Sequence, residues 1–162
     1  MTSTTSGTTT TSSGSALSAQ GTAVEPTTAP REARAPRILL YSDDATVREQ
    51  VRMAVGRRVR VGAPDIVWKE VATAPAVVAA ADAGGWDLLV LDGEADKAGG
   101  MGLSRQLKNE IYECPPVLVL TGRPQDGWLA SWSLADDAVP RPFDAMELQR
   151  SVRDLLGAAG AR

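Results

Sequence analysis

The sequence predicts an α/β protein with a doubly wound, five-stranded parallel sheet, and two patterns in the chain indicate this fold class. From Arg37 onward, short apolar runs of strand length alternate with segments of helical period, which is typical of βα units. The runs DLLVL and PVLVL are apolar without any polar alternation, as in strands that are covered on both faces. These two strands therefore belong in the middle of the sheet.

The apolar runs predict the strands in chain order. They lie at 37–41, 66–71, 87–91, 116–120 and 138–139. The segments between and after them predict the helices, at 46–55, 75–83, 103–111, 125–134 and 145–156. Asp44 or Ala45 precedes the first helix and Gly56 ends it, while Gly84 closes the second and Asp144 opens the last.

The ends of the chain and one internal loop differ from this pattern. Residues 1–36 are Thr, Ser, Gly, Ala and Pro with almost no large apolar side chain, so a disordered tail is expected; a phosphorylation or docking segment is the alternative. One domain is expected over 37–158, with a short C-terminal tail at 159–162. The basic segment 56–65 predicts an exposed loop, with a binding role as the alternative.

Composition excludes several classes of function. The net charge of −3, with no basic cluster on a predicted face, argues against a nucleic-acid partner. Cys114 is the single cysteine and there is no histidine, which excludes an internal disulfide, a Cys/His zinc site and a histidine base, and fits a reducing cytoplasm. No run approaches the roughly 20 apolar residues of a spanning helix, and no signal-peptide pattern is present, so direct membrane insertion is not expected.

Polar residues follow the predicted strands at the edge where such sheets bind ligands. They are Ser42, Asp43 and Asp44 after the first strand, Asp92 after the third, Thr121 after the fourth and Arg141 near the fifth. Carboxylates from two strand ends can bind Mg²⁺, while a hydroxyl and a cation can hold the oxygens of a phosphoryl group transferred onto Asp92. The alternative for Asp92 is a turn aspartate in the pair DG.

Four segments together resemble the receiver domain of two-component response regulators. They are RILLYSDDATVRE, WDLLVLDGE, PVLVLTGRP and DDAVPRPFDAMELQRSVRDLL. The resemblance implies the flavodoxin-like strand order 2-1-3-4-5, a phosphoacceptor aspartate after the third strand, a histidine kinase as phosphoryl donor, and signalling through the surface of the fourth helix, fifth strand and fifth helix. It places a metal-ligand acid at Asp43, the phosphoacceptor at Asp92 and the phosphoryl-following hydroxyl at Thr121.

Three positions depart from the family pattern. Ser42 stands where most receivers have the first of two paired acids, so Mg²⁺ binding is expected to be weak or absent; Asp44 is either a substitute ligand or a helix cap. Arg141 replaces the family's lysine, and it could contact a phosphoryl group or pair permanently with Asp43 or Asp92. Ala138 takes the place of the aromatic side chain that usually moves on activation, and the loop after Asp92 is altered.

The chain ends soon after the last predicted helix, so we expect a non-enzymatic binding module that acts through a contact made by the receiver itself. Trp128 and Trp132 are four residues apart and share a helical face, which makes them candidates for a partner contact. The alternative is core packing or simple coverage of the sheet edge, and Leu129 and Leu134 could fill the core without the tryptophans. Trp68 and Trp86 are expected to be structural.

Further details of the sequence resemble a group of stand-alone actinobacterial receiver proteins. They lie in YSDDATVREQVRMAVGRR, LDGEADKAGGMG and PPVLVLTGRPQDGWLASWS. For that group the resemblance implies association with the respiratory NADH:quinone oxidoreductase, complex I, which would bring the protein to the cytoplasmic face of the membrane through a protein partner.

Two functional hypotheses follow from these observations. The first is an orphan receiver with degenerate chemistry that works by protein contact, as an accessory subunit of a large complex. The second is a phosphorylation-dependent regulator or phosphate shuttle that uses Asp92. A flavin protein or a small hydrolase on the same fold is disfavoured, because SDDAT is too acidic for a flavin phosphate and no GxSxG segment is present.

Overall fold

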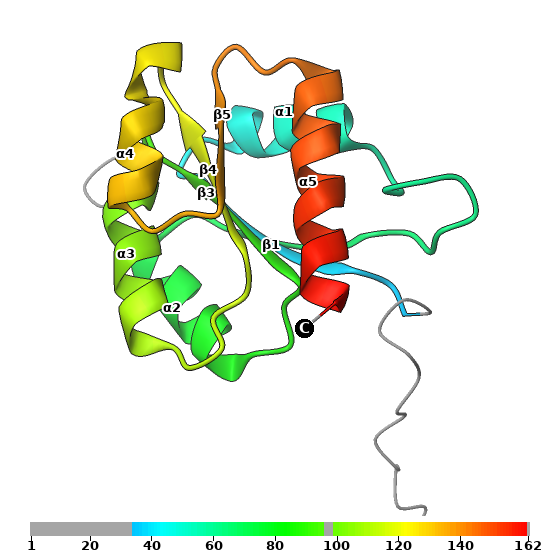
Figure 1. The fold of residues 1–162 in the computed structure, drawn as a ribbon, viewed down its shortest axis with the longest axis horizontal. Helices are drawn as coiled ribbons and strands as arrows, with labels where there is room; N and C mark the ends of the chain where they lie inside the picture. The colour runs from blue at the N-terminus through cyan, green and yellow to red at the C-terminus, as the bar shows by residue number, and fades with distance from the viewer. Residues whose placement is uncertain (1–33, 96–98, 162) are drawn as a thin grey trace, which may run out of the picture.

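A five-stranded parallel sheet forms the centre of the protein in a computed structural model, which describes residues 34–95 and 99–161 (Figure 1). The strands are β1 (Arg37–Tyr41), β2 (Val67–Val71), β3 (Leu88–Asp92), β4 (Val117–Thr121) and β5 (Asp137–Pro140). They are hydrogen-bonded in the order β2-β1-β3-β4-β5, and every pair is parallel. The predicted fold class and strand order are confirmed.

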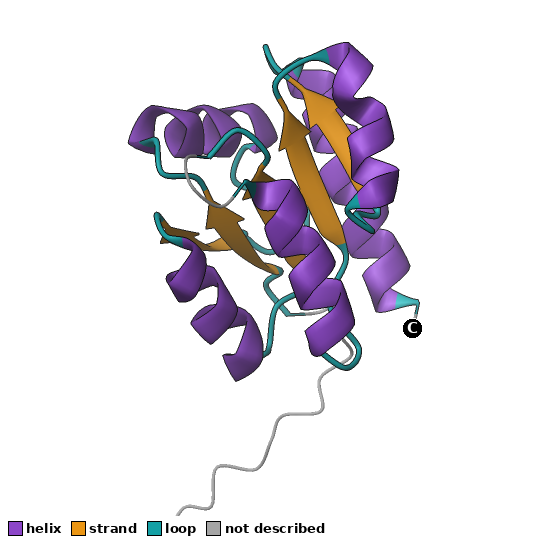
Figure 2. Cartoon of the chain, turned by 90° about the vertical axis from the view of Figure 1, so that its left-hand side faces the viewer, coloured by secondary structure: helices purple, strands orange, loops and turns teal. Residues whose placement is uncertain are grey.

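Helices cover both faces of the sheet (Figures 1 and 2). One face carries α1 (Ala45–Val55) and α5 (Ala145–Gly160), and the other carries α2 (Ala74–Ala83), α3 (Gly100–Glu110) and α4 (Gly127–Trp132). Side chains of β1 alternate between the two layers: Ile38 and Leu40 pack with α1 and α5, and Leu39 and Tyr41 pack with α2 and α3. An unbroken apolar strand is therefore required, because both of its faces are buried.

The central strands supply most of this core. All residues of β3 and of β4 are buried, and their apolar side chains join the same two clusters. A fully buried aliphatic side chain contributes roughly 1.5 to 3 kcal/mol from removal of its surface from water. The sheet is therefore a rigid platform for the residues that follow its strands.

Several element boundaries differ from the prediction. In place of the predicted helix 125–134, the structure has a 3-10 turn, η2 (Pro124–Asp126), followed by the short α4. Leu134 lies beyond the end of α4 and has a left-handed backbone at φ 59°. Helix α3 begins at Gly100 instead of 103, and α5 continues to Gly160 instead of 156. Ala159, placed in the predicted C-terminal tail, is buried in this longer helix.

The predicted N-terminal tail lies almost wholly outside the described residues. Arg34 is described, and its guanidinium pairs with the carboxylate of Asp87 at 2.7 Å.

The basic loop 56–65 is largely exposed, with Arg57 and Arg58 both paired with Asp65, and these pairs lower the pKa of the Asp65 carboxyl. Between residues 34 and 161, leaving out 96–98, no helix is long and apolar enough to cross a membrane.

Trp68 and Trp86 have the structural roles expected of them. Trp86 is buried against α2 and donates its indole N–H to the carbonyl of Ala80 at 2.6 Å. Trp68 is half-buried and packs against the core layer of α1 and α5.

Candidate phosphoacceptor site

The predicted site residues meet at the carboxyl edge of the sheet. Tyr41 of β1 is level with Leu91 of β3, so Ser42 follows β1 at the height of Asp92, which ends β3. Thr121 ends β4 opposite Pro140 of β5, and Arg141 follows directly. Because the strands are parallel and in register, these side chains share one rim of the sheet.

The carboxylate of Asp92 is enclosed by donors. Its Oδ2 accepts a hydrogen bond from the Ser42 hydroxyl at 2.7 Å and lies in ion-pair contact with Arg141. Its Oδ1 accepts a hydrogen bond from the backbone N–H of Glu94 at 3.0 Å. Only 2% of the Asp92 side chain is exposed. Both oxygens are therefore engaged, as a buried carboxylate requires.

Arg141 approaches Asp92 as a charge rather than as a hydrogen-bonded fork. Its Nη2 is in ion-pair contact with Oδ2, and neither Nη2 nor the buried Nε has a hydrogen-bond acceptor among the described residues. The guanidinium lies 5.9 Å from the Phe143 ring centre, and the Arg141-Pro142 peptide bond is cis. The expected alternative, in which Arg141 pairs with Asp92, is the arrangement observed.

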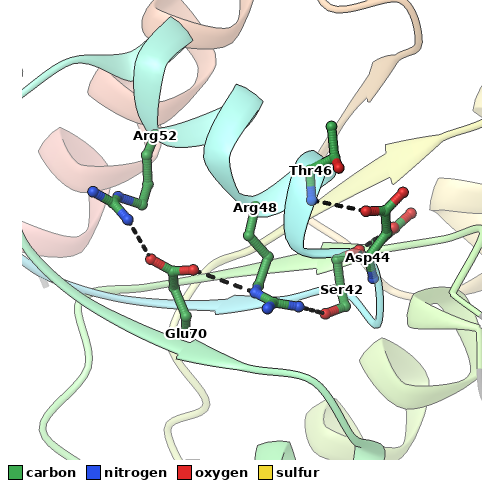
Figure 3. Close-up of polar contacts among 7 residues, drawn as sticks. Ser42, Asp44, Thr46, Arg48, Arg52 and Glu70 are labelled. Carbon is green, nitrogen blue, oxygen red and sulfur yellow. Dashed lines mark hydrogen bonds and ion pairs between the residues drawn. The ribbon is translucent and has the colours of Figure 1, made fainter.

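Of the other predicted residues, Thr121 is buried, whereas Asp43 and Asp44 are exposed. Thr121 is buried, and its hydroxyl donates to the carbonyl of Arg123 at 3.3 Å. Asp43 is exposed beside the site. Asp44 is the N-cap of α1: its Oδ1 accepts the Thr46 N–H at 2.7 Å (Figure 3), so of the two roles left open for Asp44 the structure shows the cap.

The pKa of the Tyr41 phenol is affected by the charges at this edge. Burial raises the pKa of its phenol, and the negative charges of Asp43 and Asp92 raise it further. Both carboxylates therefore act on one hydroxyl.

These residues fit Mg²⁺ poorly. Ser42 is neutral, the Asp44 carboxylate is committed to the helix cap, and the Asp92 carboxylate faces a guanidinium. Within the described part of the chain, no group of three or more His, Cys, Asp or Glu side chains could hold a metal ion. Hard divalent cations prefer several oxygen ligands, and the neutral Ser42, the capping Asp44 and the ion-paired Asp92 reduce what this edge offers.

Sequence reasoning missed two features around Asp92. Arg48 of α1 donates its Nη1 to the carbonyl of Ser42 at 2.6 Å (Figure 3), and no local motif signals this contact. Gly100 begins α3 directly against Asp92, since a Cβ at this glycine would lie 2.6 Å from the Asp92 carbonyl oxygen. The Gly99-Gly100 pair was the available signal, because glycine permits close backbone approach.

Helix α4 carries the largest exposed aromatic side chains. Trp128 is 67% exposed and Trp132 is 51% exposed, so the alternative of core packing is wrong. Leu134, expected to fill the core in their place, is itself 44% exposed. Arg105 of α3 lies over the Trp132 ring at 5.1 Å and donates to the Trp132 carbonyl at 2.7 Å, which orients this side chain toward α3.

Comparisons with known proteins identify the family. The chain is 54% identical over 129 residues to a response regulatory protein of Mycobacterium tuberculosis, in both strain CDC 1551 and strain H37Rv, covering 80% of this chain and 97% of the relative. It is 36% identical over 121 residues to the response regulator PmrA of Pseudomonas aeruginosa, covering 74% of this chain and 52% of PmrA. No family model matches the chain.

Solved structures agree on the fold. The receiver domain of Francisella response regulator 1452 matches 76% of this chain and 98% of its own, with a TM-score of 0.64 and 18% identity. The signal receiver domain of an HD-domain protein from Pseudomonas fluorescens matches 80% of this chain and 100% of its own, with a TM-score of 0.67 and 17% identity. Sheet order, helix placement and sequence relatives agree: the chain belongs to the response regulators and has their receiver domain.

Proposed function

We propose that this receiver works by protein-protein contact, with a phosphoacceptor position whose chemistry is degenerate. The observation that carries the proposal is the ion pair of Arg141 with Asp92, reinforced on the same oxygen by the Ser42 hydroxyl. Phosphoryl transfer to a carboxylate needs an oxygen free to attack phosphorus and a cation to neutralise the incoming charge. In this site the cation already neutralises the carboxylate.

The proposal includes weak or absent Mg²⁺ binding and no catalytic turnover by the protein itself. Ser42 removes one negative charge from the edge relative to the family pattern, which lowers the attraction for a divalent cation, while Arg141 keeps the positive charge of the lysine that it replaces. Asp92 must also leave a buried ion pair before it can react, and breaking such a pair is costly. These effects act in the same direction.

The contact surface that we propose lies on α4. Exposed tryptophans are unusual on a monomer surface and are enriched among the residues that contribute most to interfaces. Trp128 and Trp132 meet this description, and Arg105 holds the second ring in place. The partner is therefore a protein with an apolar pocket that is large enough for an indole ring.

One candidate partner is the respiratory NADH:quinone oxidoreductase, which the sequence resemblance suggests. Binding to it would place this receiver at the cytoplasmic face of the membrane through protein contact. Purification of the native protein from its own cells tests the suggestion: a stable complex containing subunits of the oxidoreductase supports it. Recovery of a histidine kinase alone, or of the receiver free of partners, contradicts it.

A phosphorylation-dependent regulator is the second candidate function, and one observation favours it. The buried Nε and Nη2 atoms of Arg141 have no hydrogen-bond acceptor among the described residues, so they could bind phosphoryl oxygens. Asp43, Asp92 and Thr121 also keep the family's residue types. In this reading a histidine kinase donates a phosphoryl group to Asp92, and Arg141 moves from the carboxylate to the phosphoryl group.

Phosphoryl uptake from acetyl phosphate separates the two candidates. Intact mass with Mg²⁺ present is compared for the wild type, for the variant S42D/R141K and for S42D/R141K/D92N. The first proposal predicts negligible uptake by the wild type and at least about tenfold faster uptake by S42D/R141K, the equivalent of regaining one charge interaction of about 1.4 kcal/mol. The triple variant should take up none. Rapid wild-type uptake on Asp92, or stabilisation by Mg²⁺ with beryllofluoride, would establish the second candidate instead.

A further inference from the structure

The position of the Ser42 hydroxyl depends on contacts that reach it from outside the site. Ser42 is fully buried, and its Oγ both donates to Asp92 and accepts the backbone N–H of Asp44 at 3.1 Å. Its carbonyl oxygen accepts the Nη1 donor of Arg48 at 2.6 Å. Its own N–H donates to the carbonyl of Val71 at 3.3 Å. The backbone of Ser42 is thus fixed from two neighbouring elements.

Arg48 is itself held by a carboxylate of the edge strand. Its Nε donates to Oε2 of Glu70 at 3.3 Å, and Arg52 donates to Oε1 of the same carboxylate at 2.7 Å (Figure 3). Only 16% of the Arg48 side chain is exposed, against 51% for Arg52. The guanidinium of Arg48 therefore bridges the end of β1 and strand β2, whereas Arg52 contacts β2 alone.

The planar guanidinium suits this bridge. It directs donors along two fixed directions at once, one to the Ser42 carbonyl and one to Glu70, whereas an ammonium group on a flexible stem cannot reproduce that fork. Glu70 and Arg52 also line a surface groove of about 580 Å³ between α1 and β2. A continuous set of polar contacts therefore runs from this groove through Arg48 and Ser42 to Asp92.

We propose that Arg48 is a positioning residue for Asp92, acting through Ser42. By donating to the Ser42 carbonyl, Arg48 keeps the Ser42 hydroxyl directed at Oδ2 of Asp92. The Asp92 carboxylate is then positioned by Ser42 as well as by Arg141. The inference rests on the proposed function for its consequence, which is that the Asp92 carboxylate stays enclosed. The geometry can be tested with no phosphoryl donor present.

The test uses the side-chain ¹³Cγ signal of Asp92, measured by NMR at pH 8 and assigned by its loss in D92N. The expected result is that S42A and R48M displace this signal in the same direction, and that S42A/R48M matches S42A alone. R48K should recover only part of the wild-type position. R52M is the matched control, because it also removes an arginine from Glu70 but does not touch Ser42, and it should leave the signal in place.

Three results would overturn the inference: an unmoved signal in S42A or in R48M, an equal displacement in R52M, or additive displacements in S42A/R48M. Thermal unfolding of R48M and R52M checks that both remain folded, since each loses one ion pair with Glu70. Failure here is distinct from failure of the proposed function. Rapid phosphoryl uptake by the wild type would refute the closed acceptor site but leave the effect of Arg48 on the carboxyl signal intact.

Discussion

The acceptor edge is the carboxyl edge of the sheet around Asp92. This edge and the outer face of α4 both reverse the usual distribution of polar and apolar groups. At the sheet edge, the carboxylate of Asp92 is buried among donors. On α4, two indole rings are largely exposed to solvent. Aspartate is ordinarily exposed and large apolar side chains ordinarily buried, so a buried charge and an exposed aromatic patch each need an explanation.

The two regions differ in how their unusual side chains are paired. The buried charge is satisfied within the chain, by Arg141, Ser42 and the Glu94 backbone. On α4, Arg105 lies over the Trp132 ring, and more than half of each tryptophan is exposed. A carboxylate that is paired within the chain, together with an exposed aromatic surface, supports the proposed contact-based function.

The largest effect should come from removing the enclosed carboxylate. D92A leaves the Arg141 guanidinium without its counter-charge and the Ser42 hydroxyl and the Glu94 N–H without their acceptor, so it should lower the free energy of unfolding by about 2 to 3 kcal/mol. Urea denaturation measures the loss. D82A, at an exposed position of α2, is the control and should change stability by less than about 0.5 kcal/mol. Equal stability of D92A and D82A would show that the enclosure of Asp92 is not stabilising.

The exposed region is tested by truncating its rings. W128A and W132A should each weaken binding of the co-purified partner by about 30-fold, the equivalent of about 2 kcal/mol for an interface anchor. Binding is measured by surface plasmon resonance. M53A is the control, since Met53 is 76% exposed on α1, on the opposite face of the sheet. If M53A were as damaging as the tryptophan variants, the contact would lie elsewhere.

A smaller effect distinguishes a cap from a metal ligand. D44A and D144A each remove an N-cap carboxylate, from α1 and α5, so each should cost about 1 kcal/mol of unfolding free energy. Thermal unfolding without metal measures both. In the S42D/R141K background, D44A should leave the rate of phosphoryl uptake unchanged. A D44A cost that appears only when Mg²⁺ is added would restore Asp44 as a ligand.

The smallest effect concerns the pH dependence of the acceptor edge. The raised pKa of Tyr41 means that the folded protein holds the phenol proton more tightly than the unfolded chain does. The resulting stability is complete below the unfolded value near pH 10 and is lost as the pH rises through the folded value. Between pH 9 and pH 11, Y41F should therefore lose less stability than the wild type.

The chain has two tyrosines, so the variant Y112F leaves Tyr41 as the single phenol. Its absorbance at 295 nm should show a midpoint above pH 10. D43N should move that midpoint down, because Asp43 is one of the charges that raise it. A midpoint at or below pH 10 would place Tyr41 in water rather than beside two carboxylates.

The central strands were predictable because both of their faces are buried. A strand with two buried faces needs apolar side chains along most of its length, and residues 88–91 of β3 and 117–120 of β4 show this directly. The caps at Asp44 and Asp144 were likewise readable, since capping is a local hydrogen bond within three residues. Convergence of Asp92, Thr121 and Arg141 at one rim followed from the parallel order of the strands.

Helix α4 was predicted less well. Its apolar residues suggested a ten-residue helix with Leu134 in the core, but Pro124 opens a 3-10 turn and Leu134 takes a left-handed conformation at the end. The period of apolar residues could not show which face points inward, because tryptophans that serve a partner have the same spacing as tryptophans that serve a core.

The sequence by itself determined the order of the elements, the strand positions to within a residue or so and the residue types at the acceptor edge, because these depend on local periodicity and on the parallel topology. Only the tertiary structure decided that Arg141 meets Asp92, that Arg48 holds Ser42 and that the α4 tryptophans face solvent. Each of these depends on side chains that join residues far apart in the chain or on the packing of whole elements, and no local pattern encodes such distances.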